Sequence, residues 1–362
     1  MISWLAFIFT LGAIVMIHEW GHFIVARFVG VKVERFSFGF GPVLWKKQGA
    51  QTEYVLSLLP LGGYVKLAGE TDNEKRGPAK PWEYRGRPIG DKAAIILAGP
   101  LINYLLGFTL FFTVFVLGTG TLTPRVGRLM KDYPAAAAGL RVGDLITAVN
   151  GRPVQTWEEM THAVQNSPDG VTLAVDRDGT HFDKIIQPKI SEQPPLFGKA
   201  KRIGMIGVAP SGEVVVRRYS VPRAFVKAGQ QVWLLTTSTI FALWSMATGA
   251  MPLKESFTGP IGIFQITASV AQKGIIPLLQ LIAILSTSIG FFNLLPVPVL
   301  DGGHLLFLVL EKWRGKPVSE RAQENCVKVG MGLLLALLAV VTYNDLVRMG
   351  VFARLTQWFS RG

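Results

Sequence analysis

Two histidines and a glutamate near the N-terminus have the types and spacing of a metal-dependent hydrolytic site. His18 and His22 stand four residues apart in the pentapeptide His-Glu-Trp-Gly-His. In a helix this spacing puts both imidazoles on one face, one turn apart, where they can bind the same metal ion. Glu19 lies beside them, where its carboxylate can accept a proton from an attacking water. The pentapeptide also occurs by chance, so its weight depends on its location.

A catalytic zinc ion takes three protein ligands and leaves one position open, so a third ligand must come from elsewhere in the chain. The single cysteine, Cys326, excludes both a Cys-x-x-Cys site and an intrachain disulfide. His162 and His181 fall in a separate module and are predicted to be surface residues. Asp301 and His304 remain, and spacing alone does not choose between them.

Both remaining candidates follow a segment that cannot be helical throughout. Residues 293–304 read Asn-Leu-Leu-Pro-Val-Pro-Val-Leu-Asp-Gly-Gly-His. Pro296 and Pro298 remove helical hydrogen bonds, so this stretch is predicted to run extended. Unwound backbone at membrane depth is tolerated only where it lines a cavity or water. A buried hydrolytic site provides such a cavity.

Composition places the chain in the membrane class. Of its 362 residues, 49% are hydrophobic and only 17% charged, against about 25% charged in soluble proteins. The net charge of +13 could indicate nucleic-acid binding, but the basic residues flank apolar blocks, which is typical of membrane orientation. We therefore expect a lipid bilayer as the environment and no nucleic-acid partner.

Four apolar stretches predict four transmembrane helices, at about 3–26, 93–118, 275–300 and 327–345. A span is favoured over a cleaved signal peptide for the first, because this stretch lacks a basic start and a small-residue cleavage site and its apolar run is too long. The His-Glu-Trp-Gly-His pentapeptide lies inside this first stretch. Ionisable residues within a membrane span are costly and by default functional, so the location predicts that the pentapeptide is an active site.

Basic residues in the loops predict the orientation. No Lys or Arg precedes Arg27, whereas 27–92 is rich in both, and Lys312, Arg314, Lys316 and Arg321 follow the third stretch. The positive-inside rule then places 27–92 in the cytoplasm and the N-terminus outside. With four spans, 121–274 also lies outside.

The run 229–253 is long enough to span a membrane, but Gln, Thr and Ser dilute its apolar character. A further crossing here would place Asp301 on the opposite side from His18 and His22, so the three could not share a metal. We therefore predict an interfacial helix at about 223–250.

A strand-rich module is predicted within 121–220. Asn150-Gly151 and Asp178-Gly179 are hairpin-turn signals, and 156–166 reads as a helix between them. From Gly139 the pattern GL-x-x-GD-x-I-x-x-VNG resembles bacterial PDZ domains; another small β-rich domain is the alternative. The resemblance implies an α+β fold that binds peptide ends by strand addition.

The two chemical motifs together resemble one family. HExxH in a first span and N-x-x-P-x-P-x-L-D-G in a later one are similar to the site-two protease family (peptidase M50), in its bacterial form with a single PDZ domain. Further stretches match nearly end to end: FSFGFGPVLW, PLGGYVKL (60–67), AGPLIN (98–103), SFTGPIGI (256–263) and KPVSERAQ (316–323).

The resemblance implies a site and a cofactor. Zn²⁺ would be held by His18, His22 and Asp301, with Glu19 as the catalytic base. Asn293 would help hold the substrate, and 31–70 would form a β-hairpin region directed at the site. Residues expected to contact substrate there are Gly62, Gly63 and Tyr64. His304 belongs to the motif, but the resemblance does not make it a ligand.

The predicted fold is thus an α-helical polytopic membrane protein with four transmembrane helices, a membrane-associated β-hairpin region and an extracytoplasmic PDZ domain. The predicted divisions are 1–120, 121–220 and 221–362. The expected activity is cleavage of transmembrane segments in the bacterial inner membrane. The resemblance implies anti-sigma factors after a first cut and remnant signal peptides as substrates, with peptide ends binding the PDZ domain.

Two other functions fit parts of the pattern. A non-catalytic receptor that senses peptides through the PDZ module would not need Glu19. A membrane-anchored peptidase for soluble peptides would place the pentapeptide outside the bilayer, whereas it lies inside an apolar run.

Overall fold

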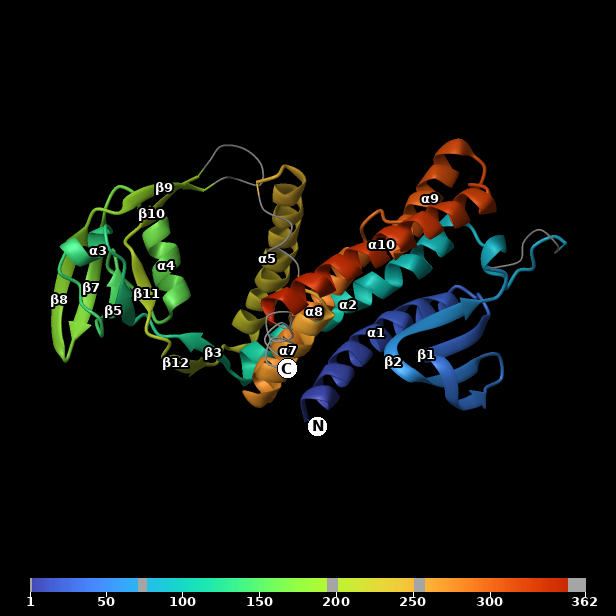
Figure 1. Ribbon diagram of the computed structural model, residues 1–362, viewed down its shortest axis with the longest axis horizontal. Coiled ribbons are helices and arrows are strands. Elements are labelled where there is room, and N and C mark those ends of the chain that lie inside the picture. Colours follow the sequence, from blue (N-terminus) through green and yellow to red (C-terminus); the bar gives the residue numbers. More distant parts are fainter. Residues whose placement is uncertain (1, 71–76, 194–200, 251–257, 351–362) are drawn as a thin grey trace, which may run out of the picture. The chain divides into compact units, whose positions relative to one another are not determined.

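The computed structural model describes residues 2–70, 77–193, 201–250 and 258–350 (Figure 1). They form two compact units, the first comprising Met1–Val114 and Val221–Gly362 and the second Phe115–Ser220. The first unit is mainly helical. Its elements are α1 (Ile2–Phe28), β1 (Val33–Gln48), β2 (Glu53–Leu67), a 3-10 turn (Tyr84–Gly86), α2 (Ile89–Leu117), α5 (Val221–Ala247), α7 (Pro260–Gln272), α8 (Ile275–Asn293), α9 (Asp301–Arg314) and α10 (Glu320–Arg348).

Four helices of the described chain are long and apolar enough to cross a membrane: α1, α2, α8 and α10. The four apolar stretches of the sequence are therefore confirmed as helices. The third ends at Asn293 rather than near residue 300, because Pro296 and Pro298 prevent its continuation. α5 covers most of the run 229–253 and is not among these four helices. The helices α7 and α9 were not predicted.

A carboxylate of α10 holds the beginning of α7. Asp345, buried at 4% exposure, accepts hydrogen bonds from the backbone N–H groups of Gly259 (3.2 Å) and Gly262 (2.9 Å). These N–H groups have no partner within the helix, and a carboxylate there also complements the helix dipole. α7 in turn packs on α1, where Phe264 contacts Trp4 with ring centroids 4.3 Å apart. The role of this carboxylate in α10 is thus structural.

The hairpin β1–β2 folds into four strand segments. Residues 33–38 pair with 63–67 on one side and, from residue 35, with 53–56 on the other. Residues 43–48 then pair with the far side of 53–57. The segment 63–67 therefore lies at an edge of this sheet, and β2 packs against α1. The bend brings this edge to the helix that carries the pentapeptide.

The second unit contains a four-stranded antiparallel sheet in the order β6-β5-β7-β8. Both predicted hairpin turns form, since Asn150 and Asp178 have φ of 49° and 51° and each precedes a glycine with positive φ. The elements of this unit are β3 (Thr119–Leu122), β4 (Val126–Leu129), α3 (Pro134–Ala137), β5 (Leu145–Val149), β6 (Arg152–Pro153), α4 (Trp157–Gln165), β7 (Val171–Arg177), β8 (Thr180–Ile186), β9 (Lys189–Gln193), β10 (Lys201–Met205), β11 (Val208–Pro210) and β12 (Val214–Arg217).

One apolar core holds this unit together. Alternate residues of β7, Val171, Leu173 and Val175, are buried and face one side of the sheet. Met160 and Val164 of α4 belong to the same core. The alternation of β7 and the four-residue spacing in α4 are the periodicities of a half-buried strand and helix.

Asp144 forms the main buried ion pair of the second unit. It is 1% exposed, and Arg177 donates to both carboxylate oxygens at 2.7 and 2.8 Å. Burial alone would raise the pKa of Asp144, but the bonds from Arg177 and from the Arg141 N–H outweigh it and hold the pKa below its ordinary value. A depressed pKa stabilises the fold above the unfolded-state pKa of about 3.9, and this stabilisation is lost as pH falls through the folded-state pKa.

We therefore expect Asp144→Asn to destabilise the second unit at pH 7 by about 2 kcal/mol, the scale of hydrogen bonds to a charged group. The difference from wild type should shrink as pH falls below about 3.9. Pulse proteolysis of the detergent-solubilised protein in urea measures both effects. Asp183→Asn, an exposed residue on β8, is the control; a pH-independent difference for Asp144→Asn would contradict the ion-pair explanation.

Candidate metal centre and active site

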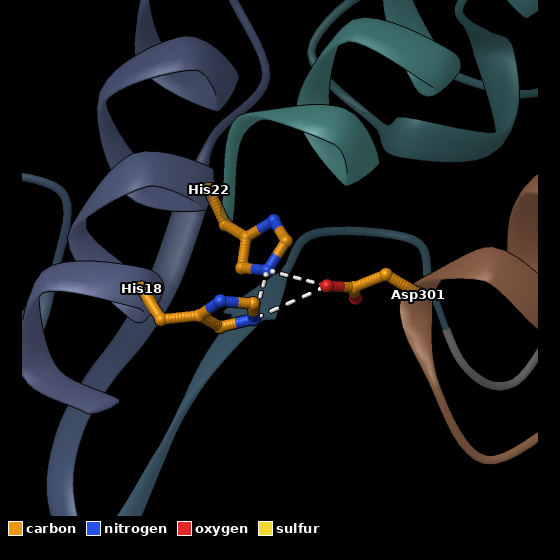
Figure 2. Close-up of side chains that lie close together, drawn as sticks. All are labelled: His18, His22 and Asp301. Atoms are coloured by element: carbon orange, nitrogen blue, oxygen red, sulfur yellow. Dashed lines mark hydrogen bonds and ion pairs between the residues drawn. The ribbon is translucent and has the colours of Figure 1, made fainter. Parts of the chain in front are cut away.

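The helix α1 presents His18 and His22 on one face, as their spacing predicts. Their Nε2 atoms are 3.2 Å apart, and their rings meet edge to face with centroids 4.8 Å apart. The side chains are only 10% and 13% exposed. The two ring nitrogens therefore point into the same small volume (Figure 2).

Asp301 completes the group from the first turn of α9. Its Oδ2 lies 3.1 Å from His18 Nε2 and 3.5 Å from His22 Nε2. The preceding residues 294–300 form turns rather than a helix, as their prolines predict, and Leu300 is extended before α9 starts. This non-helical segment delivers Asp301 to the two histidines (Figure 2). The structure thus selects Asp301, and not His304, as the third member.

These three atoms fit a zinc ion. Ligands about 2.0–2.2 Å from a tetrahedral ion lie roughly 3.3–3.6 Å from one another, close to the 3.1, 3.2 and 3.5 Å separations found here. Asp301 Oδ2 is buried and accepts no hydrogen bond from the described residues. A buried carboxylate oxygen facing the lone pairs of two imidazole nitrogens is costly unless a cation or a proton lies between them.

The helix α2 fixes the proton of His22. Its Nδ1 lies 2.8 Å from the carbonyl oxygen of Ile95. A carbonyl oxygen only accepts, so Nδ1 carries the hydrogen and Nε2 of the neutral ring keeps a lone pair for a metal. Pro100 of α2 has no N–H to donate to the carbonyl of Ile96. One helical hydrogen bond is therefore missing next to the Ile95 carbonyl.

Gly99 allows α2 to approach the metal ligands. A Cβ at this position would overlap His22 Nε2 and lie 2.8 Å from His18 Cε1. Neither Gly99 nor the Ile95 carbonyl was identified as functional from the sequence. Gly99 stands in the AGPLIN stretch, where a glycine inside an apolar helix is a signal of close packing. The Ile95 carbonyl could not be found from the sequence, because every residue type carries a backbone carbonyl.

Glu19 lies next to the triad but outside it. It lines the same cavity as His18, His22 and Asp301. The hairpin comes close to it, because a Cβ on Gly63 would lie 3.1 Å from Glu19 Cγ and 2.7 Å from the carbonyl oxygen of Ser37. A carboxylate beside a metal site and free of metal binding can transfer protons.

The cavity has a volume of about 1100 Å³ and reaches from the triad toward the start of α10. Asn293, Tyr64 and His304 line it. Gly62 does not; it packs under the ring of Phe40, which stacks on Tyr64 with centroids 6.3 Å apart. The three hairpin residues predicted to contact substrate therefore differ in position. Tyr64 lines the cavity, Gly63 approaches Glu19, and Gly62 packs against Phe40 within the hairpin.

A metal-binding triad with a neighbouring carboxylate, whose two histidines lie on a helix that can cross a membrane, defines a membrane-embedded metallopeptidase. The chain belongs to peptidase family M50, whose pattern matches residues 6–337. It is accordingly a metalloprotease, and its cofactor is zinc.

Similar proteins cover nearly the whole chain. The regulator of sigma-E protease RseP of Escherichia coli is 30% identical, with 95% of this chain and 98% of the relative aligned. A predicted zinc metalloprotease of Agrobacterium fabrum is 34% identical over 94% of each chain. Among solved structures, the PDZ domain of an SdrC-like protein of Listeria monocytogenes covers 24% of this chain and 84% of its own, at 22% identity and a TM-score of 0.19.

Proposed function

We propose that this chain is an intramembrane protease that cuts transmembrane segments of single-span membrane proteins. The position of the triad is the observation that supports this most. His18 and His22 lie inside α1, a helix able to cross a membrane, and Asp301 follows the loop after another such helix, α8. A peptide bond that reaches a site at this depth belongs to a segment in the membrane.

His18, His22 and Asp301 hold the zinc ion in this proposal. Bound zinc supplies Lewis-acid stabilisation to the scissile carbonyl and makes water a better nucleophile. Glu19 accepts a proton from the attacking water as the water oxygen bonds to the carbonyl carbon. Glu19 then gives that proton to the leaving nitrogen as the C–N bond breaks.

The edge segment 63–67 of β2 is proposed to bind the substrate strand. A peptide bond inside a helix is sterically shielded, so the substrate must unwind before cleavage. Within the described residues this edge has no strand partner on its outer side, and such an edge can pair with an extended peptide. Gly63 permits the approach to Glu19, Tyr64 lines the cavity, and Asn293 at the end of α8 helps hold the substrate.

The proposed location is the bacterial inner membrane. Basic residues within 27–92 support a cytoplasmic hairpin region, with the second unit extracytoplasmic and acting as a PDZ domain that binds peptide ends. α5 would then lie at the interface, which its exposed apolar residues Phe225, Trp233 and Trp244 favour. The E. coli relative is named as a regulator of sigma-E protease. We propose anti-sigma factors as one substrate class and remnant signal peptides as a second.

One experiment tests this function directly. The purified protein in detergent is assayed for zinc and for cleavage of a single-span test protein, with the same segment made polar and soluble as the comparison. We expect bound zinc, cleavage within the apolar segment, and loss of both zinc and cleavage in Asp301→Asn. Cleavage confined to the soluble peptide would contradict intramembrane proteolysis, and full zinc binding by Asp301→Asn would contradict the ligand set.

A further inference from the structure

His18, like His22, needs a hydrogen-bond partner for its Nδ1 atom if its Nε2 is to bind a metal. One side chain, that of Asn103, lies at the right place. Asn103 of α2 is fully buried at 0% exposure, and its carboxamide nitrogen lies 3.2 Å from Nδ1 of His18. Its own carbonyl oxygen, Oδ1, accepts no hydrogen bond from the described residues. Ser286 of α8 donates to the main-chain carbonyl of Asn103 at 2.8 Å, so the backbone position is fixed independently of the amide.

The chemistry of the triad decides which end of the amide faces His18. Nε2 of His18 points at Asp301 Oδ2 and His22 Nε2, so Nε2 is the atom available to a metal. A neutral imidazole that binds metal through Nε2 carries its hydrogen on Nδ1. An N–H on Nδ1 needs an acceptor, and a carboxamide nitrogen cannot accept. Rotating the amide by 180° places Oδ1 at the same point.

We propose that Asn103 is a positioning residue of the metal site, whose Oδ1 accepts the Nδ1–H of His18 when zinc is bound. This rests on the proposed zinc ligation by His18. With this role for Asn103, one face of α2 positions both histidines, because Ile95, Gly99 and Asn103 are spaced by four residues along the helix. The Ile95 carbonyl orients His22, Gly99 lets the helices meet, and Asn103 orients His18.

The test compares two replacements of Asn103 in the full-length protein. Asn103→Leu keeps the approximate volume and removes the acceptor, whereas Asn103→Asp keeps an acceptor and removes the amide donor. Zinc affinity is measured by chelator competition. We expect Asn103→Leu to lose about 10–100-fold in affinity, the usual effect of removing a partner of a metal-bound histidine, and Asn103→Asp to stay within a few-fold of wild type.

Ser286→Ala is the matched control, because it removes the bond to the Asn103 main chain and leaves the carboxamide in place. It should keep wild-type zinc affinity. Equal losses for Asp and Leu at 103 would overturn the proposal, since the amide would then act as a donor. A loss in Ser286→Ala as large as in Asn103→Leu would reduce Asn103 to packing.

Nitrogen-15 spectra of labelled histidines give a readout that needs no protease activity. We expect Nδ1–H on His18 in the zinc-bound wild type, and its signal to shift in Asn103→Leu but not in Ser286→Ala. A deprotonated Nδ1 would overturn the inference. Wild-type protein that binds zinc but cleaves no transmembrane segment would contradict the proposed function and leave the role of Asn103 intact.

Discussion

Replacing Glu19 by glutamine is expected to lower peptide cleavage by about 10²–10⁴-fold, the usual contribution of a general base, while zinc stays bound. Glutamine matches the size of glutamate but cannot take a proton from water. Glu19 is outside the group of three atoms that converge as ligands, so its replacement leaves the metal in place. Single-turnover cleavage and zinc content, measured on one preparation, separate the two effects.

Glu324→Gln is the control for this change. Glu324 is exposed and lines the same cavity, at the α10 end. The Glu324→Gln protein should cleave substrate at nearly the wild-type rate. Cleavage by Glu19→Gln within about tenfold of wild type would mean that another group accepts the proton, and loss of zinc from Glu19→Gln would mean that this residue is a ligand.

Replacing Gly99 by alanine is expected to remove zinc and activity together. The added Cβ would overlap His22 Nε2 and lie 2.5 Å from His22 Cε1 and 2.8 Å from His18 Cε1. Both rings must move, and neither can move without leaving the position that meets Asp301. The loss of zinc affinity should therefore exceed the roughly 100-fold that misorienting one histidine costs, and chelator competition measures it.

Two glycines of the same helix separate this effect from changes in helix stability. A Cβ on Gly90 meets nothing within 4 Å, so Gly90→Ala should keep zinc and gain up to about 1 kcal/mol of helix stability. A Cβ on Gly107 would overlap Thr287 Oγ1 of α8, away from the metal ligands. Gly107→Ala should lower thermal stability and still bind zinc. Equal zinc loss in Gly107→Ala would show that helix packing, rather than the ring contact, explains Gly99→Ala.

Much of the site could be predicted because its information is local. The four-residue spacing of His18 and His22 determines their common face once the segment is helical. Pro296 and Pro298 end α8 and force the turns that precede Asp301. The choice between Asp301 and His304 could not be made from spacing, because both lie on the first turn of α9. It depends on how that turn faces α1.

By itself, the sequence determined the four apolar helices, the histidine pair and the two hairpin turns of the second unit, because each depends on residues within a few positions of one another. Only the tertiary structure decided that the Ile95 carbonyl and Asn103 meet His22 and His18, across 73 and 85 residues. It also decided that Asp345 holds the start of α7 and that the hairpin bends to bring 63–67 to Glu19. Contacts of this range depend on how whole helices pack, and a backbone carbonyl leaves no mark on the residue types that a sequence displays.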